Sequence, residues 1–121
     1  MSEILIEQLG TVMILDVEGE LTYDLAVNAL NEFYPFTACH VLWDLRKCSK
    51  FNISVSEYKE LLLFANNNMT DRIAGKTAVA CPNEKMYEML MKLKALKETS
   101  SMPSEYKIFK EFHQALDWVN E

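Results

Sequence analysis

The sequence has few of the residue types that build metal, phosphate and disulfide sites. Its three cysteines, Cys39, Cys48 and Cys81, have a spacing that matches no zinc or Cys-x-x-Cys pattern, so we expect reduced thiols and no metal. None of its three glycines has the spacing of a phosphate-binding loop. Its two histidines, His40 and His113, belong to no recognisable arrangement with a nucleophile. We therefore expect a protein that is not an enzyme, with no catalytic residues and no cofactor.

Basic residues and long apolar runs are also scarce. Twelve lysines and arginines against 18 aspartates and glutamates leave a net charge of −6, which argues against general binding to nucleic acid or to anionic membranes. No apolar run reaches the ~18 residues of a membrane span. The first ten residues carry glutamates where a secretory signal carries lysines. We therefore expect a cytoplasmic protein that neither binds nucleic acid nor inserts into a membrane.

Apolar side chains make up half of the 121 residues, enough to build a core without disulfide or metal support. We therefore expect a single domain over residues 1–121. Strand-like and helix-like patterns alternate along it in the order ββαβαβαβα. This order predicts an α/β fold with a mixed five-stranded sheet and about four helices. Its later strands are expected to be parallel and joined by right-handed crossovers.

The first half of the chain contains a hairpin, a helix and a central strand. Residues 4–8 and 12–17 have the β-branched composition of strands, and Gly10 between them suits a hairpin turn. Thr22 is the N-cap candidate of the first helix. Residues 41–45 are continuously apolar, which is typical of a central strand covered on both faces.

The second half of the chain contains three helix patterns and two strands. Ser54 and Glu57 have the spacing of a capping box, in which each residue binds a backbone N–H of the other. Asn83 follows a strand at 76–81 and is the N-cap candidate of the third helix, and a short edge strand at 106–109 precedes the terminal helix. The apolar residues at helical spacing are Tyr58, Leu61, Leu62, Ala65, Met86, Met89, Leu90, Leu93, Phe112, Ala115, Leu116 and Val119.

The stretch HVLWDLRKCSKFNISVS joins the central strand to the second helix. We expect residues 46–56 to form the connecting loop and helix start at the carboxyl edge of the sheet. Open α/β sheets bind ligands at this edge, and helix N-termini accept anions. The residues that are candidates for binding an anion or a partner here are Arg46, Lys47, Lys50 and Phe51.

A series of short motifs runs along nearly the whole chain. They are a hairpin, a strand ending Trp43-Asp44-Leu45-Arg46, a capped helix, a Gly75-Lys76-Thr77-Ala78-Val79 strand, a methionine-rich helix and the spacing Phe109-x-x-Phe112-x-x-Ala115-x-x-Trp118. Together they resemble the SpoIIAA-like family of small bacterial STAS-related proteins. The resemblance implies a five-stranded sheet with helices largely on one side, as in anti-sigma factor antagonists.

The same resemblance implies a place for regulation. In those antagonists the strand-to-helix loop carries an Asp-Ser-Ser/Thr-Gly motif whose hydroxyl is phosphorylated by a partner kinase, and the helix binds that partner. The matching stretch is Asn52-Ile53-Ser54-Val55-Ser56, which lacks the aspartate and the glycine. Ser54 and Ser56 are therefore candidate phospho-acceptors at a helix N-terminus, which favours negative charge. The alternative is that Ser54 only caps the helix, which contributes about 1 kcal/mol.

We interpret the chain as a non-enzymatic regulatory or binding module that acts through protein-protein contacts at residues 46–56. The partner is a protein, and homodimerisation through an exposed helix face is a further option. Tyr58, Phe51 and Tyr87 are candidate aromatic anchors for such a contact.

The alternative is a domain that binds a small anionic or apolar ligand through the same loop. Met86, Met89 and Met91 would then line an apolar pocket, although methionine at helical spacing is more often part of a core. Asp44 is interpreted as a structural ion-pair partner of Arg46 rather than as a catalytic acid or base.

Overall fold

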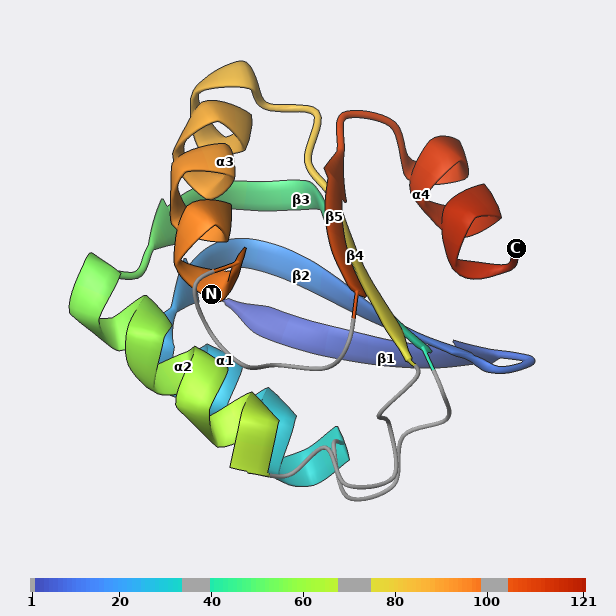
Figure 1. Ribbon diagram of the computed structural model, residues 1–121. Helices are drawn as coiled ribbons and strands as arrows, with labels where there is room; N and C mark the ends of the chain where they lie inside the picture. Colours follow the sequence, from blue (N-terminus) through green and yellow to red (C-terminus); the bar gives the residue numbers. More distant parts are fainter. Residues whose placement is uncertain (1, 34–39, 68–74, 99–104) are drawn as a thin grey trace.

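The computed structural model describes residues 2–33, 40–67, 75–98 and 105–121 (Figure 1). Its elements follow the predicted order ββαβαβαβα. The strands are β1 (Glu3–Leu9), β2 (Val12–Thr22), β3 (His40–Asn52), β4 (Lys76–Ala80) and β5 (Glu105–Phe109). The helices are α1 (Tyr23–Phe33), α2 (Val55–Asn67), α3 (Glu84–Glu98) and α4 (Phe112–Val119). Within these ranges, no helix has the length and apolar character that crossing a membrane requires.

The five strands form one mixed sheet in the order β1-β2-β3-β4-β5. β1 is antiparallel to β2, and the remaining neighbours are parallel, as predicted. The prediction of a central strand at 41–45 is confirmed, because β3 lies in the middle of the sheet and Val41 and Leu42 are fully buried. β5 is an edge strand, also as predicted.

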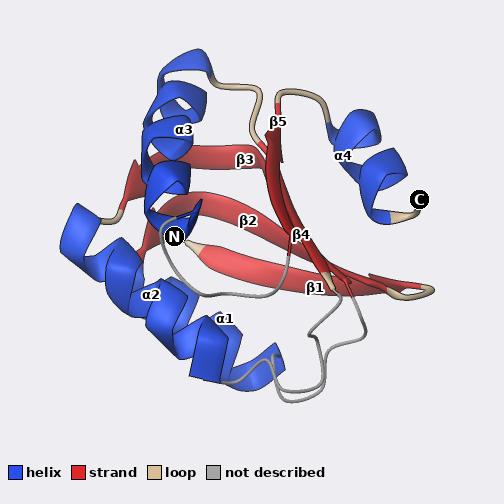
Figure 2. Cartoon of the chain, viewed as in Figure 1, coloured by secondary structure: helices blue, strands red, loops and turns tan. Residues whose placement is uncertain are grey.

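Helices cover both faces of this sheet, three on one face and one on the other (Figure 2). The larger core lies between the sheet and α1, α2 and α3, where Leu45, Ile53 and Leu90 pack together. The smaller core lies under α4, where Ala115 and Val119 pack against residues of β2, β3 and β4. Three of the four described helices therefore lie on one side of the sheet, which agrees with the expectation of helices largely on one side.

Local signals for turns and helix starts are confirmed. Gly10 has a φ of +62° and connects Leu9 to its partner Val12, as the first central residue of a type II′ hairpin turn requires. The Thr22 Oγ1 accepts from the backbone N–H of Leu25 at 3.3 Å. The Asn83 Oδ1 likewise accepts from the backbone N–H of Met86 at 3.0 Å. Thr22 and Asn83 therefore cap the first and third helices, as predicted.

The prediction of a loop from residue 46 is wrong, because β3 continues to Asn52. β2 is also longer than predicted, and its end pairs in parallel with the end of β3. Glu18 lies opposite Lys47, with which it forms an ion pair, and Glu20 lies opposite Lys50 in the register. The pairing shifts register twice there, and Gly19 has a φ of +87°. These irregularities break the period of two by which a strand is recognised in a sequence.

Candidate functional site

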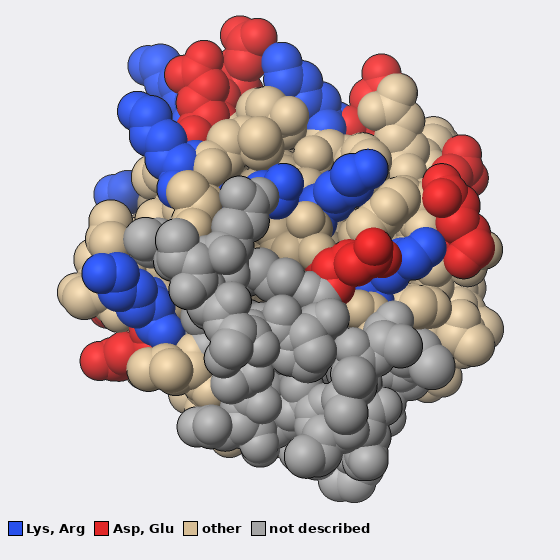
Figure 3. All heavy atoms as spheres, viewed as in Figure 1, with Lys and Arg blue, Asp and Glu red and all other residues tan. Residues whose placement is uncertain are grey.

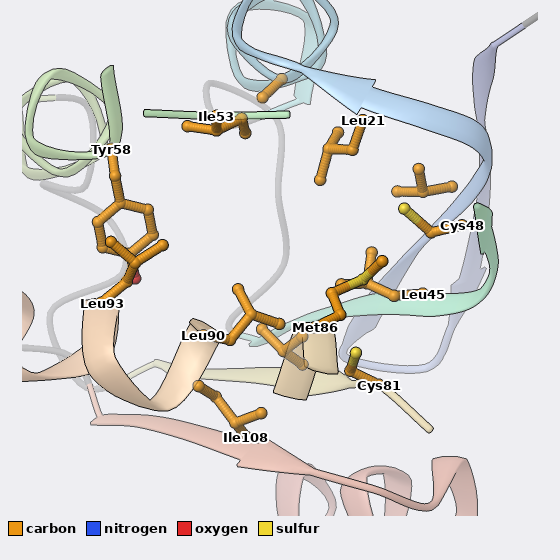
Figure 4. Packing of buried hydrophobic residues seen from close by; sticks show 13 residues of the cluster. Leu21, Leu45, Cys48, Ile53, Tyr58, Cys81, Met86, Leu90, Leu93 and Ile108 are labelled. Atoms are coloured by element: carbon orange, nitrogen blue, oxygen red, sulfur yellow. The ribbon is translucent and has the colours of Figure 1, made fainter. Parts of the chain in front are cut away.

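The start of α2 lies at the carboxyl edge of the sheet, directly after β3. Only Ile53 and Ser54 separate the two elements. The Ile53 side chain is buried in the larger core and anchors this connection (Figure 4). Ser54, Val55 and Ser56 are exposed next to that anchor. The connection therefore presents three exposed side chains from a backbone held between a strand and a helix.

Ser54 and Glu57 form the predicted capping box. The Ser54 Oγ accepts from the backbone N–H of Glu57 at 3.2 Å, and the Glu57 Oε1 accepts from the backbone N–H of Ser54 at 2.9 Å. The capping role of Ser54 is thereby confirmed. Ser56 differs, since no hydrogen bond joins its hydroxyl to another residue in the described ranges. Of the two candidate phospho-acceptors, only Ser56 has a hydroxyl without a structural role there.

The outward side of α2 carries two exposed aliphatic residues that the sequence analysis missed. Val55 is 53% exposed and Leu63 is 64% exposed, and the exposed Lys59 lies between them at four-residue spacing. The signal for Leu63 is the run Leu61-Leu62-Leu63, because three consecutive helical residues cannot all face one core. Exposed aliphatic side chains beside a polar rim suit contact with a protein.

A hydrogen bond joins α2 to α1. The Tyr23 hydroxyl donates to Glu60 Oε2 at 2.9 Å, and this bond, with neighbouring carboxylates, raises the pKa of Tyr23 above its ordinary value of 10.0. The neutral phenol is thus favoured by the fold. Any stabilisation from this bond is present below pH 10 and decreases as the pH rises through the raised pKa.

Arg46 pairs with Asp44, as predicted, and also reaches α4. Its guanidinium donates to both carboxylate oxygens of Asp44, with Nη2 at 2.8 Å from Oδ2 and Nε at 3.0 Å from Oδ1. This hydrogen-bonded pairing raises the pKa of Arg46 above its ordinary value. The guanidinium carbon also lies 3.9 Å from the centre of the Phe112 ring. Arg46 therefore connects a buried carboxylate of β3 to the first residue of α4.

Lys47 and Lys50 differ in their surroundings. The Lys47 Nζ lies 3.6 Å from Asp16 Oδ2 and 3.5 Å from Glu18 Oε2, and these carboxylates raise its pKa. Lys50 is exposed, and no described residue forms an ion pair with it. Basic and acidic side chains are likewise interspersed on the face drawn in Figure 3. The charge of Lys47 is therefore balanced by neighbouring carboxylates, whereas Lys50 has no such partner among the described residues.

The structure does not bring Arg46 and Lys47 next to Ser54. At about 3.3 Å per strand residue, the part of β3 from Arg46 to Asn52 spans on the order of 20 Å. Lys50 is closer along the chain, only four residues before Ser54. Roles for Arg46, Lys47, Lys50 and the two serines in binding or modification stay predictions.

The candidate aromatic anchors are mostly used inside the protein. Tyr58 is 7% exposed, packs beside Leu93 (Figure 4), and donates its hydroxyl to that of Tyr106 at 3.1 Å. The expectation of Tyr58 as a surface anchor is therefore wrong, because its ring fills the core. Phe51 is half-buried against the same core, and the Lys110 Nζ lies 5.0 Å from the centre of the Tyr87 ring.

Three of the residues on which a pocket or an active site was considered, Met86, Met89 and His40, have structural roles. Met86 is buried and Met89 packs against the larger core, whereas Met91 is 41% exposed, so these methionines do not line one pocket together. The His40 Nδ1 accepts from the backbone N–H of Lys76 at 3.0 Å. His113 is exposed on α4. Within the described ranges, no three acidic, histidine or cysteine side chains are grouped to hold a metal.

Cys48 and Cys81 are free, buried thiols. Burial raises the pKa of both, which disfavours the reactive thiolate. Cys39 lies outside the described residues. The expectation of reduced thiols therefore agrees with the two cysteines that the structure describes.

No protein-family model matches the sequence, and no curated protein is similar to it in sequence. Solved structures nevertheless share its fold. The anti-sigma factor antagonist SpoIIAA in its unphosphorylated form has a TM-score of 0.60 at 15% identity, over 97% of each chain. An anti-sigma factor antagonist from Mycobacterium paratuberculosis has a TM-score of 0.65 at 16% identity, over 100% of this chain and 96% of that chain.

A third structure is SpoIIAA of Bacillus in its phosphorylated form. Its TM-score is 0.59 at 17% identity, over 96% of this chain and 98% of that chain. Identities this low show the fold alone. The chain has a SpoIIAA-like fold, which confirms the architecture that the sequence motifs predict.

Proposed function

We propose that this chain is a regulatory binding module whose protein partner docks on the α2 face, defined as Ser54, Val55, Ser56, Lys59 and Leu63. The observation that carries this proposal is the exposure of Val55 and Leu63 on one side of a helix that starts at the carboxyl edge of the sheet. The fold shared with anti-sigma factor antagonists supports it, since such proteins act by contacting other proteins.

Within this proposal, Ser56 is the better placed of the two candidate phospho-acceptors. A phosphate on Ser54 would lie against the Glu57 carboxylate, which binds the Ser54 backbone 2.9 Å away, and like charges repel there. Ser56 is exposed in the first turn of α2, where the helix N-terminus favours negative charge. Phosphorylation of Ser56 would change the charge of the α2 face and leave the capping box in place.

Quantitative affinity capture from extracts of the source organism tests this proposal. The protein would carry Ser56→Asp or the neutral, nearly isosteric Ser56→Asn. We expect the aspartate variant to change the recovery of one protein partner several-fold, and the asparagine variant to behave as wild type. The same pair at Ser54 is informative, because aspartate and asparagine are equally good N-caps and differ in charge.

Two further variants test the location of the contact. Leu63→Lys changes the most exposed aliphatic residue of the α2 face, whereas His113→Lys changes an exposed residue of α4. We expect Leu63→Lys to abolish recovery of the partner and His113→Lys to leave it unchanged. Equal recovery with all of these variants would contradict the proposal.

A further inference from the structure

The outer edge of β1 is the most apolar exposed part of the sheet. β1 is at one end of the strand order, and β2 is its only neighbour among the described strands. Leu5, Ile6 and Leu9 are 46%, 39% and 45% exposed, and they are half of the exposed large hydrophobic residues in the described ranges. An unpaired strand edge offers backbone N–H and C=O groups to another strand. The edge therefore combines backbone groups for pairing with apolar side chains for contact.

One face of β1 alternates acidic and aliphatic side chains. Successive residues of a strand point to opposite faces, so four residues share the face on which α4 packs. They are Glu3, Leu5, Glu7 and Leu9. The cluster under α4 includes Val12 and Ile14, which pair with Leu9 and Glu7, but no described residue of β1 itself. Figure 2 shows the β1–β2 hairpin extending away from α1, α2 and α3. The alternating face is thus left without a helix from the described residues.

The charge on this face is unbalanced. Glu3 lies directly opposite Glu18, and Leu5 lies opposite Asp16, so the carboxylates cluster across β1 and β2. Lys47 forms ion pairs with Asp16 and Glu18. Glu3 and Glu7 have no ion pair with another residue in the described ranges. The uncompensated carboxylates therefore lie on the strand whose edge is open.

The same carboxylates argue against pairing between two copies of β1. An antiparallel pair centred on Ile6 would bring the two Glu7 side chains into diagonal neighbouring positions, and Glu3 of each strand next to Glu7 of the other. Like charges at such positions are destabilising. Charge complementarity favours a basic strand from a different protein.

We propose that the β1 edge binds an extended segment of a partner protein in which lysine or arginine alternates with aliphatic residues. Its backbone would add a sixth strand beside β1. Its basic side chains would share the face of Glu3 and Glu7, and its aliphatic side chains would lie on the opposite face, beside Ile4 and Ile6. This surface uses none of the residues of the α2 face, so it does not depend on the function proposed above.

Titration of the isotope-labelled protein with the peptide acetyl-Lys-Leu-Lys-Ile-Lys-Leu-Lys-amide tests the proposal. Chemical shift changes of the protein's backbone amides, measured by NMR, are the readout. We expect the largest shifts at residues 3–9 and slower hydrogen exchange of β1 amides. A peptide N-methylated at every residue keeps its charge, but its residues have no backbone N–H to donate to β1. Its binding is expected to be lost.

Paired charge variants give the matched control. The double variant Glu3→Gln/Glu7→Gln should weaken binding of the peptide about three- to tenfold, from the loss of two cross-strand charge pairs. Glu88→Gln/Asp117→Asn makes the same change in net charge on exposed positions of α3 and α4 and should leave binding unchanged. This comparison separates a specific contact from general attraction to an acidic protein.

Three outcomes would overturn the proposal. One is equal binding of the N-methylated peptide, and another is equal weakening by the two charge variants, since both indicate adsorption by charge alone. The third is self-association in sedimentation experiments that Glu7→Lys abolishes, because the occupant of the edge would then be a second copy of this chain. Each outcome leaves the partner contact at the α2 face unaffected, so the two proposals fail separately.

Discussion

At the scale of single residues, Asp44 shows how a charged side chain at the sheet edge is used for structure. Asp44 is 3% exposed, and its carboxylate accepts from the backbone N–H, the Nε and the Nη2 of Arg46, whose guanidinium also stacks on Phe112. A buried carboxylate without its partner carries an uncompensated desolvation cost. The Asp44–Arg46 pair therefore stabilises the packing of α4 on β3 rather than providing an acid and a base.

We predict that Arg46→Met lowers the free energy of unfolding by about 2 kcal/mol, a value reduced from that of a fully buried pair because half of the Arg46 side chain is exposed. Urea denaturation measures the change. Lys47→Met is the matched control and should change stability by less than about 0.5 kcal/mol, since its ion pairs are solvent-exposed. In a double-mutant cycle with Asp44→Asn, additive losses would contradict the pairing.

The two buried thiols lead to a prediction about reactivity and pH. Burial raises the pKa of Cys48 and Cys81 above 9.0, so the unfolded chain loses these protons first as the pH rises. Stability should therefore be unaffected by the thiols below pH 9 and should decrease above it. In a Cys39→Ser variant at pH 8, Ellman's reagent should modify the remaining thiols far more slowly than in urea. Equal rates in both conditions would show that the thiols are accessible.

At the scale of elements, short-range signals predict the structure better than periodicity does. The helix caps at Thr22, Ser54 and Asn83 and the turn at Gly10 are confirmed, because each depends on residues three or fewer positions apart. The extension of β3 beyond residue 45 is not predictable in this way. It depends on pairing with a β2 segment about 30 positions earlier, through two register shifts that erase the alternation.

We predict that Ser54→Ala lowers the free energy of unfolding by about 1 kcal/mol, because it removes the acceptor for the Glu57 backbone N–H. Ser54→Asn should retain wild-type stability, since asparagine is an equally good N-cap. Thermal and urea denaturation followed by helical circular dichroism provide the measurement. Equal stability of the alanine and asparagine variants would mean that the cap does not contribute.

The corrected boundary of β3 leads to a prediction for hydrogen exchange. Amides of residues 47–52 that bond to β2 should exchange about a hundredfold more slowly than those of Val55 and Ser56, whose N–H groups lie in the first turn of α2. Exchange read out residue by residue by NMR tests this. Uniformly fast exchange over residues 47–52 would contradict the extended β3 and support the loop that the sequence pattern predicts.

At the scale of the whole molecule, two different elements carry exposed apolar surfaces. One lies on α2, where Val55 and Leu63 are exposed, and the other lies on the outer edge of β1. The sequence predicts the first location, with Ser54 and Ser56, through its capping box and its SpoIIAA-like motifs, but it does not predict the exposed aliphatic side chains of Val55 and Leu63. The exposure of Leu63 depends on which side of α2 faces α1 and the core. Only the packed structure determines that side.

Cross-linking from defined positions in living cells of the source organism tests the central claim, that the partner docks on the α2 face. A photo-reactive amino acid would replace Val55, Leu63 or, as a control on α4, His113. We predict that Val55 and Leu63 yield a cross-link to the same protein and that His113 yields none. A cross-link from His113 with none from Val55 or Leu63 would contradict the account.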